Sequence, residues 1–95
     1  MLVKEFLDYL RSERNCSART VGEYGDDLQK FESFFKNLDA TLTWETVDSD
    51  VIRDWMESMM DKGNIATSVN RRLSAVRSFY RFALSRGLVA ADPSH

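Results

Sequence analysis

The sequence has very few of the residue types from which disulfides, metal sites and catalytic sites are built. Its one cysteine, Cys16, cannot form an internal disulfide, and a reducing compartment is the consistent interpretation. Its one histidine, His95, is the last residue. The chain shows no spacing typical of metal ligands, of a phosphate-binding glycine loop or of paired catalytic carboxylates. We therefore expect no catalytic residue, metal, cofactor or small-molecule ligand.

Long apolar runs are also missing. No run approaches the roughly 20 residues that span a bilayer, and the N-terminus lacks the apolar core of a signal peptide. We therefore expect a soluble, cytoplasmic protein with no membrane contact. With 95 residues, 43% of them hydrophobic and 12% aromatic, the chain can bury one modest core. This favours a single small domain, or a piece of a larger protein, over a disordered chain.

Acidic side chains are missing from one part of the chain. From Ile65 to Ala91 there are five arginines and no carboxylate, although the formal net charge of the whole chain is −2. Fourteen of the fifteen carboxylates stand within the first 63 residues, beside eight basic side chains. A concentrated basic stripe is typical of a surface that binds a polyanion, and nucleic acid is the commonest candidate.

Apolar residues recur every three or four positions in four segments, which predicts an all-α fold, a small bundle of four main helices. The first two helices are expected at residues 2–14 and at about 18–37, the second with Ser17 as its N-cap. Gly22 and Gly25 are poor residues for a helix interior, each costing on the order of 1 kcal/mol relative to alanine. We therefore expect another part of the chain to hold or closely approach the start of the second helix.

The third and fourth helices are predicted to follow a threonine-rich loop, which Trp44 is expected to anchor to the core. Asp48 can cap the third helix, which ends at residues 62–63. Thr67 is the expected cap of the fourth helix, and Gly87 is expected to stop it. The predicted buried side chains of these two helices are Val51, Ile52, Trp55, Met56, Met59, Met60, Val69, Leu73, Val76, Tyr80, Ala83 and Leu84.

One side of the predicted fourth helix mixes arginines with short polar side chains. Small side chains let a helix approach a phosphate backbone or groove floor, and arginine forks reach phosphate oxygens or guanine edges. No carboxylate stands four positions away to neutralise the arginines, which favours charges kept for another molecule. A solvated basic face without a function is the equally weighted alternative. At 100° per residue the shared side holds Asn70, Ser74, Arg77, Ser78, Arg81 and Ser85, with Arg71 on its flank and Arg72 towards the apolar side.

The start of the second helix is the other candidate site. Ser17, Arg19 and Thr20 lie where the free N–H groups of a helix N-terminus can bind a phosphate. Simple capping is the more frequent use of such residues. Carboxylates that follow within two turns would repel a polyanion, so only the first turn is a credible contact.

Two sequence blocks carry a family resemblance. The pattern S-x-R-T-x-x-x-Y-x-x-D-L-x-x-F-x-x-F from Ser17 to Phe34, followed by NRRLSAVRSFYRFALSRGLVAADP from Asn70 to Pro93, resembles the N-terminal SAM-like core-binding domain of tyrosine recombinases, the phage integrase and Xer type. The resemblance covers essentially the whole chain. It implies a four-helix domain that forms half of a C-shaped clamp on double-stranded DNA, with its second and fourth helices on the major groove and backbone. It also implies protomers of the same or a related recombinase as partners in a synaptic tetramer.

Carried over position by position, the resemblance implies roles for single residues. Arg77 is the strongest candidate for a DNA contact, because it lies mid-face and matches the arginine of the L-S-A-x-R segment. Asp27 matches the D-L pair, where a structural hydrogen bond or salt bridge is expected. Tyr24, Leu28, Phe31, Leu73, Val76, Phe79 and Tyr80 also match and are expected in the core. The expected DNA-binding residues are Ser17, Arg19, Thr20, Asn70, Arg71, Ser74, Arg77, Ser78 and Arg81.

In this family the tyrosine nucleophile and its activating arginines, lysine and histidines belong to a separate C-terminal domain. The resemblance therefore implies that residues 1–91 are the core-binding domain. Residues 92–95, with Pro93 disfavouring helix before it, are expected to begin a linker to a catalytic domain that the chain lacks. The fragment is expected to bind DNA without catalysis, within a protein that is a recombinase.

Two other classes of protein stay open at this point. The chain is also compatible with a helical protein-interaction module of the death-fold or SAM kind, whose arginine face meets an acidic partner helix. The third possibility is a freestanding small regulator that borrows the recombinase fold to occupy DNA without cutting it. The reading frame beyond His95 would separate these alternatives.

Overall fold

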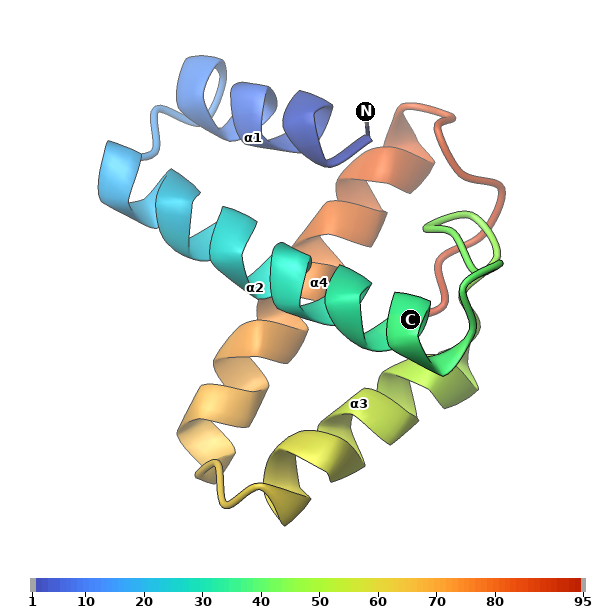
Figure 1. Ribbon diagram of the computed structural model, residues 1–95. Helices are drawn as coiled ribbons and strands as arrows, with labels where there is room; N and C mark the ends of the chain where they lie inside the picture. The colour runs from blue at the N-terminus through green and yellow to red at the C-terminus, as the bar shows by residue number, and fades with distance from the viewer. Residues whose placement is uncertain (1, 95) are drawn as a thin grey trace.

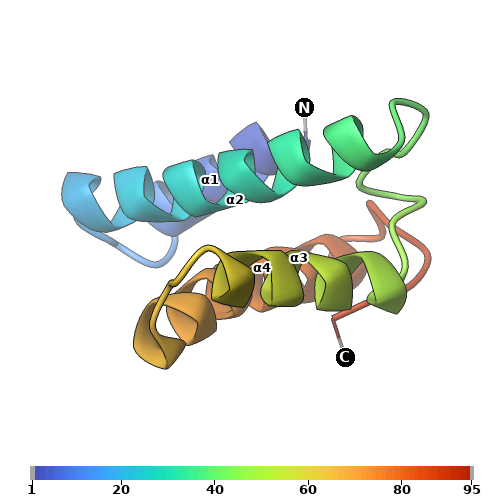
Figure 2. The same ribbon diagram turned by 60° about the horizontal axis from the view of Figure 1, so that its bottom comes forward.

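The computed structural model describes residues 2–94 as four helices arranged in two layers. Helices α1 (Leu2–Ser12) and α2 (Ala18–Leu38) run antiparallel in one layer, and α3 (Ser49–Asp61) and α4 (Ala66–Ser85) form the other (Figures 1 and 2). Helix α2 crosses over α4, so these two long helices form the centre of the molecule. The all-α prediction is thereby confirmed. None of the helices in this described range is long and apolar enough to cross a membrane.

Aromatic side chains fill the space between the layers. Phe31 and Phe35 on α2 pack against Trp44, which in turn lies over Phe79 and Tyr80 on α4. Trp44 is 8% exposed, and its carbonyl accepts a hydrogen bond of 2.7 Å from the buried Tyr80 hydroxyl. The predicted anchoring of the loop between α2 and α3 by Trp44 is therefore confirmed. Because the loop is pinned at its middle, it brings α3 back against α2 and α4.

Local side chains explain most of the helix ends, and the start of α4 is the exception. Asp48 caps α3 by accepting a hydrogen bond from the Val51 N–H at 3.1 Å, and Gly87 ends α4 in a left-handed conformation. The predicted cap Thr67 is wrong, since α4 begins at Ala66 with Ile65 as an N-cap that makes no side-chain hydrogen bond. The turn before it is closed by Asn64, whose amide donates to the Met59 carbonyl at 2.9 Å, so the chain re-enters helix earlier than expected.

Two predicted core residues lie at the surface. Met60 is 59% exposed and Leu84 is 44% exposed. Ala75 and Phe82 on α4 are buried in their place. For Leu84, the physical reason is that α4 packs against α1 and α2 on one flank and against α3 on the other, so its buried sector is wider and rotated relative to the apolar stripe. Met60 lies on α3, outside the side of that helix on which Val51, Trp55 and Met59 are buried.

The α2 glycines differ in their surroundings. A Cβ on Gly25 would lie 3.3 Å from Leu7 Cδ1 of α1, whereas a Cβ on Gly22 would meet nothing within 4 Å. The expected close approach therefore occurs at Gly25. It lets α1 pack tightly across the first half of α2.

The chain folds back after α4. Val89 is buried, and Pro93 and Ser94 lie beside α3 and Arg77. His95, the last residue of the predicted linker, lies outside the described residues, as does Met1 of the predicted domain.

Candidate nucleic-acid interface

The outer side of α4 carries the predicted polar stripe. Asn70, Ser74, Arg77 and Arg81 are exposed, and Ser78 is half-buried. All five fall within the sector of the helix that packs against no other helix, because α1, α2 and α3 cover the rest of its circumference. The stripe is therefore accessible to a partner molecule.

The stripe has two flanks that face different neighbours. On the α2 flank, Ser74 and Arg71 line a groove together with Thr20. On the α3 flank, Arg77 lines a small pocket with residues of α3 and with Pro93 and Ser94. The structure thus brings Thr20, Arg71 and Ser74 together, whereas Arg77 points towards the opposite edge of the stripe rather than its middle.

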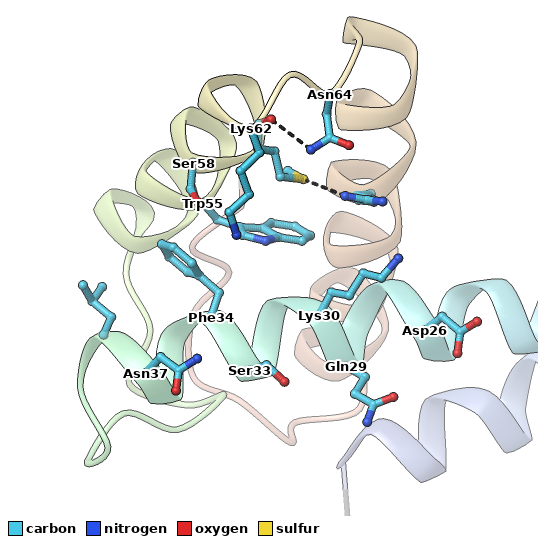
Figure 3. A pocket seen from close by; sticks show the side chains of 13 residues that line it. Asp26, Gln29, Lys30, Ser33, Phe34, Asn37, Trp55, Ser58, Lys62 and Asn64 are labelled. Carbon is cyan, nitrogen blue, oxygen red and sulfur yellow. Dashed lines mark hydrogen bonds between the residues drawn. The ribbon is translucent and has the colours of Figure 1, made fainter.

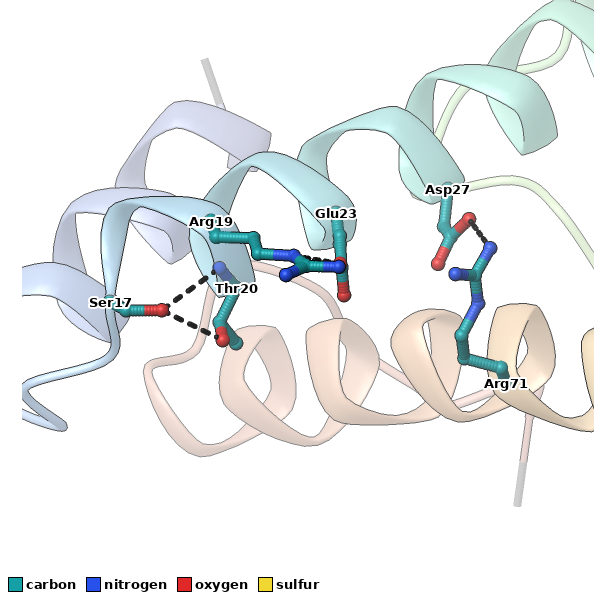
Figure 4. Close-up of polar contacts among 6 residues, drawn as sticks. All are labelled: Ser17, Arg19, Thr20, Glu23, Asp27 and Arg71. Atoms are coloured by element: carbon teal, nitrogen blue, oxygen red, sulfur yellow. Dashed lines mark hydrogen bonds and ion pairs between the residues drawn. The ribbon is translucent and has the colours of Figure 1, made fainter.

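The first turn of α2 is held by its own capping contacts. The Ser17 Oγ accepts a hydrogen bond from the Thr20 N–H at 3.2 Å and lies 3.1 Å from the Thr20 hydroxyl (Figure 4). The Arg19 side chain is 89% exposed and pairs with Glu23 at 3.3 Å. Ser17 and Thr20 therefore cap the helix, and Arg19 neutralises one of the carboxylates of α2, that of Glu23.

Asp27 is buried between α2 and α4. Its side chain is 4% exposed and lies 3.3 Å from Arg71 (Figure 4). Arg72 lies 3.9 Å from the same carboxylate. Burial raises the pKa of the Asp27 carboxyl, and the charges of Arg71 and Arg72 oppose that rise. The expected structural role of Asp27 is confirmed. Arg71, at 54% exposed, is the arginine of the predicted set that this carboxylate partly neutralises.

The five arginines from Arg71 to Arg86 have no carboxylate four positions away, as expected, but three of them have a carboxylate partner from elsewhere in the chain. Arg71 and Arg72 face Asp27, and Arg86 pairs with Glu13 at 2.8 Å while lying over the rings of Tyr9 and Phe82. These partners come from α2 and from the residues after α1, so a search four positions away could not find them. Within residues 2–94, Arg77 and Arg81 are the two α4 arginines without an ion pair.

A basic residue outside the predicted set joins this surface. Arg14 follows α1 in the connection to α2 and lines a notch with Ser78 and Arg81. A side-chain hydrogen bond with Tyr9 raises the pKa of Arg14, and the guanidinium, like that of any arginine, is charged at neutral pH. In the sequence, Arg14 could be recognised only as a basic side chain shortly before the N-cap Ser17. Helical periodicity does not predict which way the Arg14 side chain points, because this residue lies in a turn.

A second basic cavity lies away from the stripe. A cavity of about 600 Å³ between α2, α3 and the first half of α4 is lined by Lys30, Lys62 and Arg72 above an apolar floor that includes Trp55 (Figure 3). Arg72 stands about 160° around α4 from Ser74, so this cavity opens on the other side of the helix. Only a weak contact with the Met59 sulfur, at 3.6 Å, and the long approach to Asp27 satisfy the Arg72 guanidinium.

The fold and this surface define a four-helix, SAM-like domain with two uncompensated arginines on the free side of its last helix. The chain belongs to the family described as the phage integrase N-terminal SAM-like domain, whose model matches residues 3–87. The resemblance read from the sequence is thereby confirmed.

Relatives from different organisms match nearly the whole chain. Tyrosine recombinase XerC of Listeria monocytogenes is 38% identical over 92 residues, which are 97% of this chain and 30% of that protein. XerC of Roseiflexus castenholzii is 34% identical and XerD of Oceanobacillus iheyensis 29% identical, again over 97% of this chain, covering 29% and 31% of those proteins. The chain thus spans about a third of the length of these relatives. No solved structure gives a significant match.

Proposed function

We propose that this chain is the DNA-binding domain of a tyrosine site-specific recombinase and forms half of a clamp around the recombination site. The observation that carries the proposal is the free side of α4, where Arg77 and Arg81 stand among small hydroxyl and amide side chains and form no ion pair with any residue that the structure describes. Such a surface can approach a phosphate backbone closely and contact it with arginine forks. The family and the Xer relatives support double-stranded DNA as the polyanion for this surface.

The proposed contacts fall into two groups. Thr20, Ser74 and Arg71 line one groove between α2 and α4, which suits a stretch of backbone held between the two helices. Arg77 lies on the opposite flank and suits a second contact nearer α3. Asn70, Ser78 and Arg81 lie along the stripe, and Ser17 and Arg19 lie at the start of α2, next in the chain to Thr20 of the groove. Because Arg19 and Arg71 already have partners in the chain, we expect them to contribute less than Arg77 and Arg81.

The remaining parts of the proposal concern the whole protein. Cleavage and strand exchange belong to a C-terminal domain that this chain does not include, in keeping with its match to about a third of each relative. Residues 92–95 begin the linker to that domain. Protomers of the same or a related recombinase are the partners in a synaptic tetramer, and the protein acts in the cytoplasm where the DNA lies.

The experiment is an NMR titration of the 15N-labelled chain with a short duplex at low salt. We expect amide shifts at residues 17–24 and 70–81 that fade as salt rises, because few phosphate contacts give weak, salt-dependent binding. Arg77→Ala and Arg81→Ala should each weaken binding about fivefold while helix content stays unchanged. Arg11→Ala, which removes an exposed arginine in the last turn of α1 that lines neither the groove nor the pocket beside Arg77, is the matched control. A folded protein with no shifts at these residues would contradict the proposal and favour a protein partner for the basic helix.

A further inference from the structure

A notch lies between the α1–α2 connection and the second half of α4, at the edge of the proposed interface. Three arginines line it: Arg14 from the α1–α2 connection, and Arg81 and Arg86 from the end of α4 and its C-cap. Ser78 and Ser85 also line it, the Ser85 hydroxyl donating to the Phe82 carbonyl at 2.8 Å, and no carboxylate is among the lining residues. The notch has a volume of about 450 Å³, which leaves room for a phosphate group and an adjoining sugar.

The three arginines are not equivalent. Arg86 is paired with Glu13 at 2.8 Å and stacks on Tyr9 and Phe82, so its charge is compensated and its position fixed. Arg14 and Arg81 have no ion pair among residues 2–94. Two uncompensated cations that line one polar notch repel each other, and an anion between them removes that repulsion.

The notch lies beside the groove between α2 and α4. Tyr24 lines both, so the two hollows are neighbours. Ser74 of the groove and Ser78 of the notch stand about one turn apart on α4, so a backbone held in the groove can extend towards Arg14 and Arg81. The groove itself contains Glu23 and Asp27, whereas the notch contains only cations and neutral groups, so it is the more favourable of the two for a phosphate.

We infer that this notch binds one phosphate of the DNA backbone, held by the guanidinium groups of Arg14 and Arg81 with the Ser78 hydroxyl as a further donor. The inference rests on the proposed function, since it names a contact within that DNA interface. It adds Arg14, a residue of the α1–α2 connection, to the binding surface. The same chemistry would accept free inorganic phosphate, so the test separates the two sources.

The first test compares Arg14→Ala with Arg11→Ala. Both remove one exposed arginine, but Arg11 lies in the last turn of α1 and does not line the notch. Duplex affinity is measured over a range of salt concentrations. We expect Arg14→Ala to weaken binding about fivefold, as for an exposed charge pair, and to reduce the slope of log K against log salt by about 0.9. Arg11→Ala should leave the slope unchanged.

The second test uses Cys16 as a local reporter. It is the only cysteine in the sequence and it lines the notch in a half-buried position. Saturating duplex should slow its alkylation by iodoacetamide, and inorganic phosphate at the concentration of the DNA phosphates should not. Protection by inorganic phosphate equal to that by duplex would overturn the assignment to DNA and indicate a small-anion site.

The outcomes separate the inference from the proposed function. If Arg14→Ala still binds duplex with the same salt slope as the unmutated chain, the notch does not bind a backbone phosphate. The proposal that the chain binds DNA would then still stand. Absence of duplex binding by the unmutated, folded chain overturns both. Arg14→Lys keeps the charge but loses the fork, and partial recovery of the slope in that variant supports a charge contact at this position.

Discussion

The carboxylate of Asp27 on α2 lies 3.3 Å from the guanidinium of Arg71 on α4, at the floor of the groove between the two helices. The contact joins residues 44 positions apart. It holds one of the arginines that would otherwise be free for DNA. The strength of the interface therefore depends on how far this buried carboxylate competes with phosphate for the same cation.

Removing that competition should strengthen DNA binding. Asp27→Asn keeps the side-chain shape but releases Arg71, and we expect duplex affinity at low salt to rise several-fold. Asp26→Asn is the matched control, because it changes the net charge equally at an exposed neighbouring position that forms no ion pair in the described part of the chain. Fluorescence anisotropy with a labelled duplex measures both. Equal gains in the two variants would mean that net charge alone, and not the release of Arg71, sets the affinity.

Asp27 should also affect the pH dependence of stability. Burial raises the pKa of this carboxyl in the folded protein above its ordinary value of about 3.9. The folded state therefore holds this proton more tightly than the unfolded state does, and the contribution of Asp27 to the free energy of unfolding falls as pH rises from about 4 through the folded pKa. Urea unfolding across this range should show Asp27→Asn gaining relative to the unmutated chain as pH rises. A constant difference, or a loss of stability by Asp27→Asn relative to the unmutated chain as pH rises, would contradict the raised pKa.

The hydrogen bond from Tyr80 to the Trp44 carbonyl should contribute measurably to stability. Tyr80→Phe leaves the buried carbonyl without its donor, so we expect a loss of about 1–2 kcal/mol in the free energy of unfolding. Tyr24→Phe removes a hydroxyl from a half-buried ring that forms no hydrogen bond in residues 2–94, and it should change stability by less than about 0.5 kcal/mol. Urea denaturation compares the two, and similar losses would mean that the Trp44 carbonyl finds another donor.

The two glycines of α2 should respond differently to alanine. Gly22→Ala adds a methyl group in open space and should stabilise the chain by about 0.5–1 kcal/mol through helix propensity. Gly25→Ala gains the same propensity but places its Cβ 3.3 Å from Leu7 Cδ1, so α1 or its leucine must shift. Thermal unfolding should therefore rank Gly22→Ala above Gly25→Ala. The reverse order would show that the approach of α1 does not restrict position 25.

Local patterns predicted much of this fold. The spacing of apolar residues predicted four helices, and the short polar side chains of Ser17 and Asp48 marked two helix starts because a cap acts on backbone groups two or three residues away. Thr67 failed as a cap because the turn closed by Asn64 lies before it. Met60 and Leu84 failed as core residues because the burial of a helix face depends on which helices cover it.

The candidate site was predictable only in part, for the same reason. The stripe on α4 follows from helical periodicity, and its exposure is as expected. The pairing of Arg71 with Asp27 and of Arg86 with Glu13 depends on contacts between distant segments. Arg14 lies in a turn, where no periodic rule gives a side chain its direction. The sequence therefore indicated where positive charge gathers but not which charges remain uncompensated.

The position of the tryptophans makes the chain its own optical reporter. Trp44 lies between the aromatic rings of α2 and α4, and Trp55 packs against Phe31, with both indoles less than 10% exposed and neither lining the groove or the notch. Their intrinsic emission therefore monitors the meeting of the two helix layers. A shift in emission on addition of duplex would report a rearrangement of the interior, whereas DNA that docks on a rigid domain should leave the spectrum unchanged.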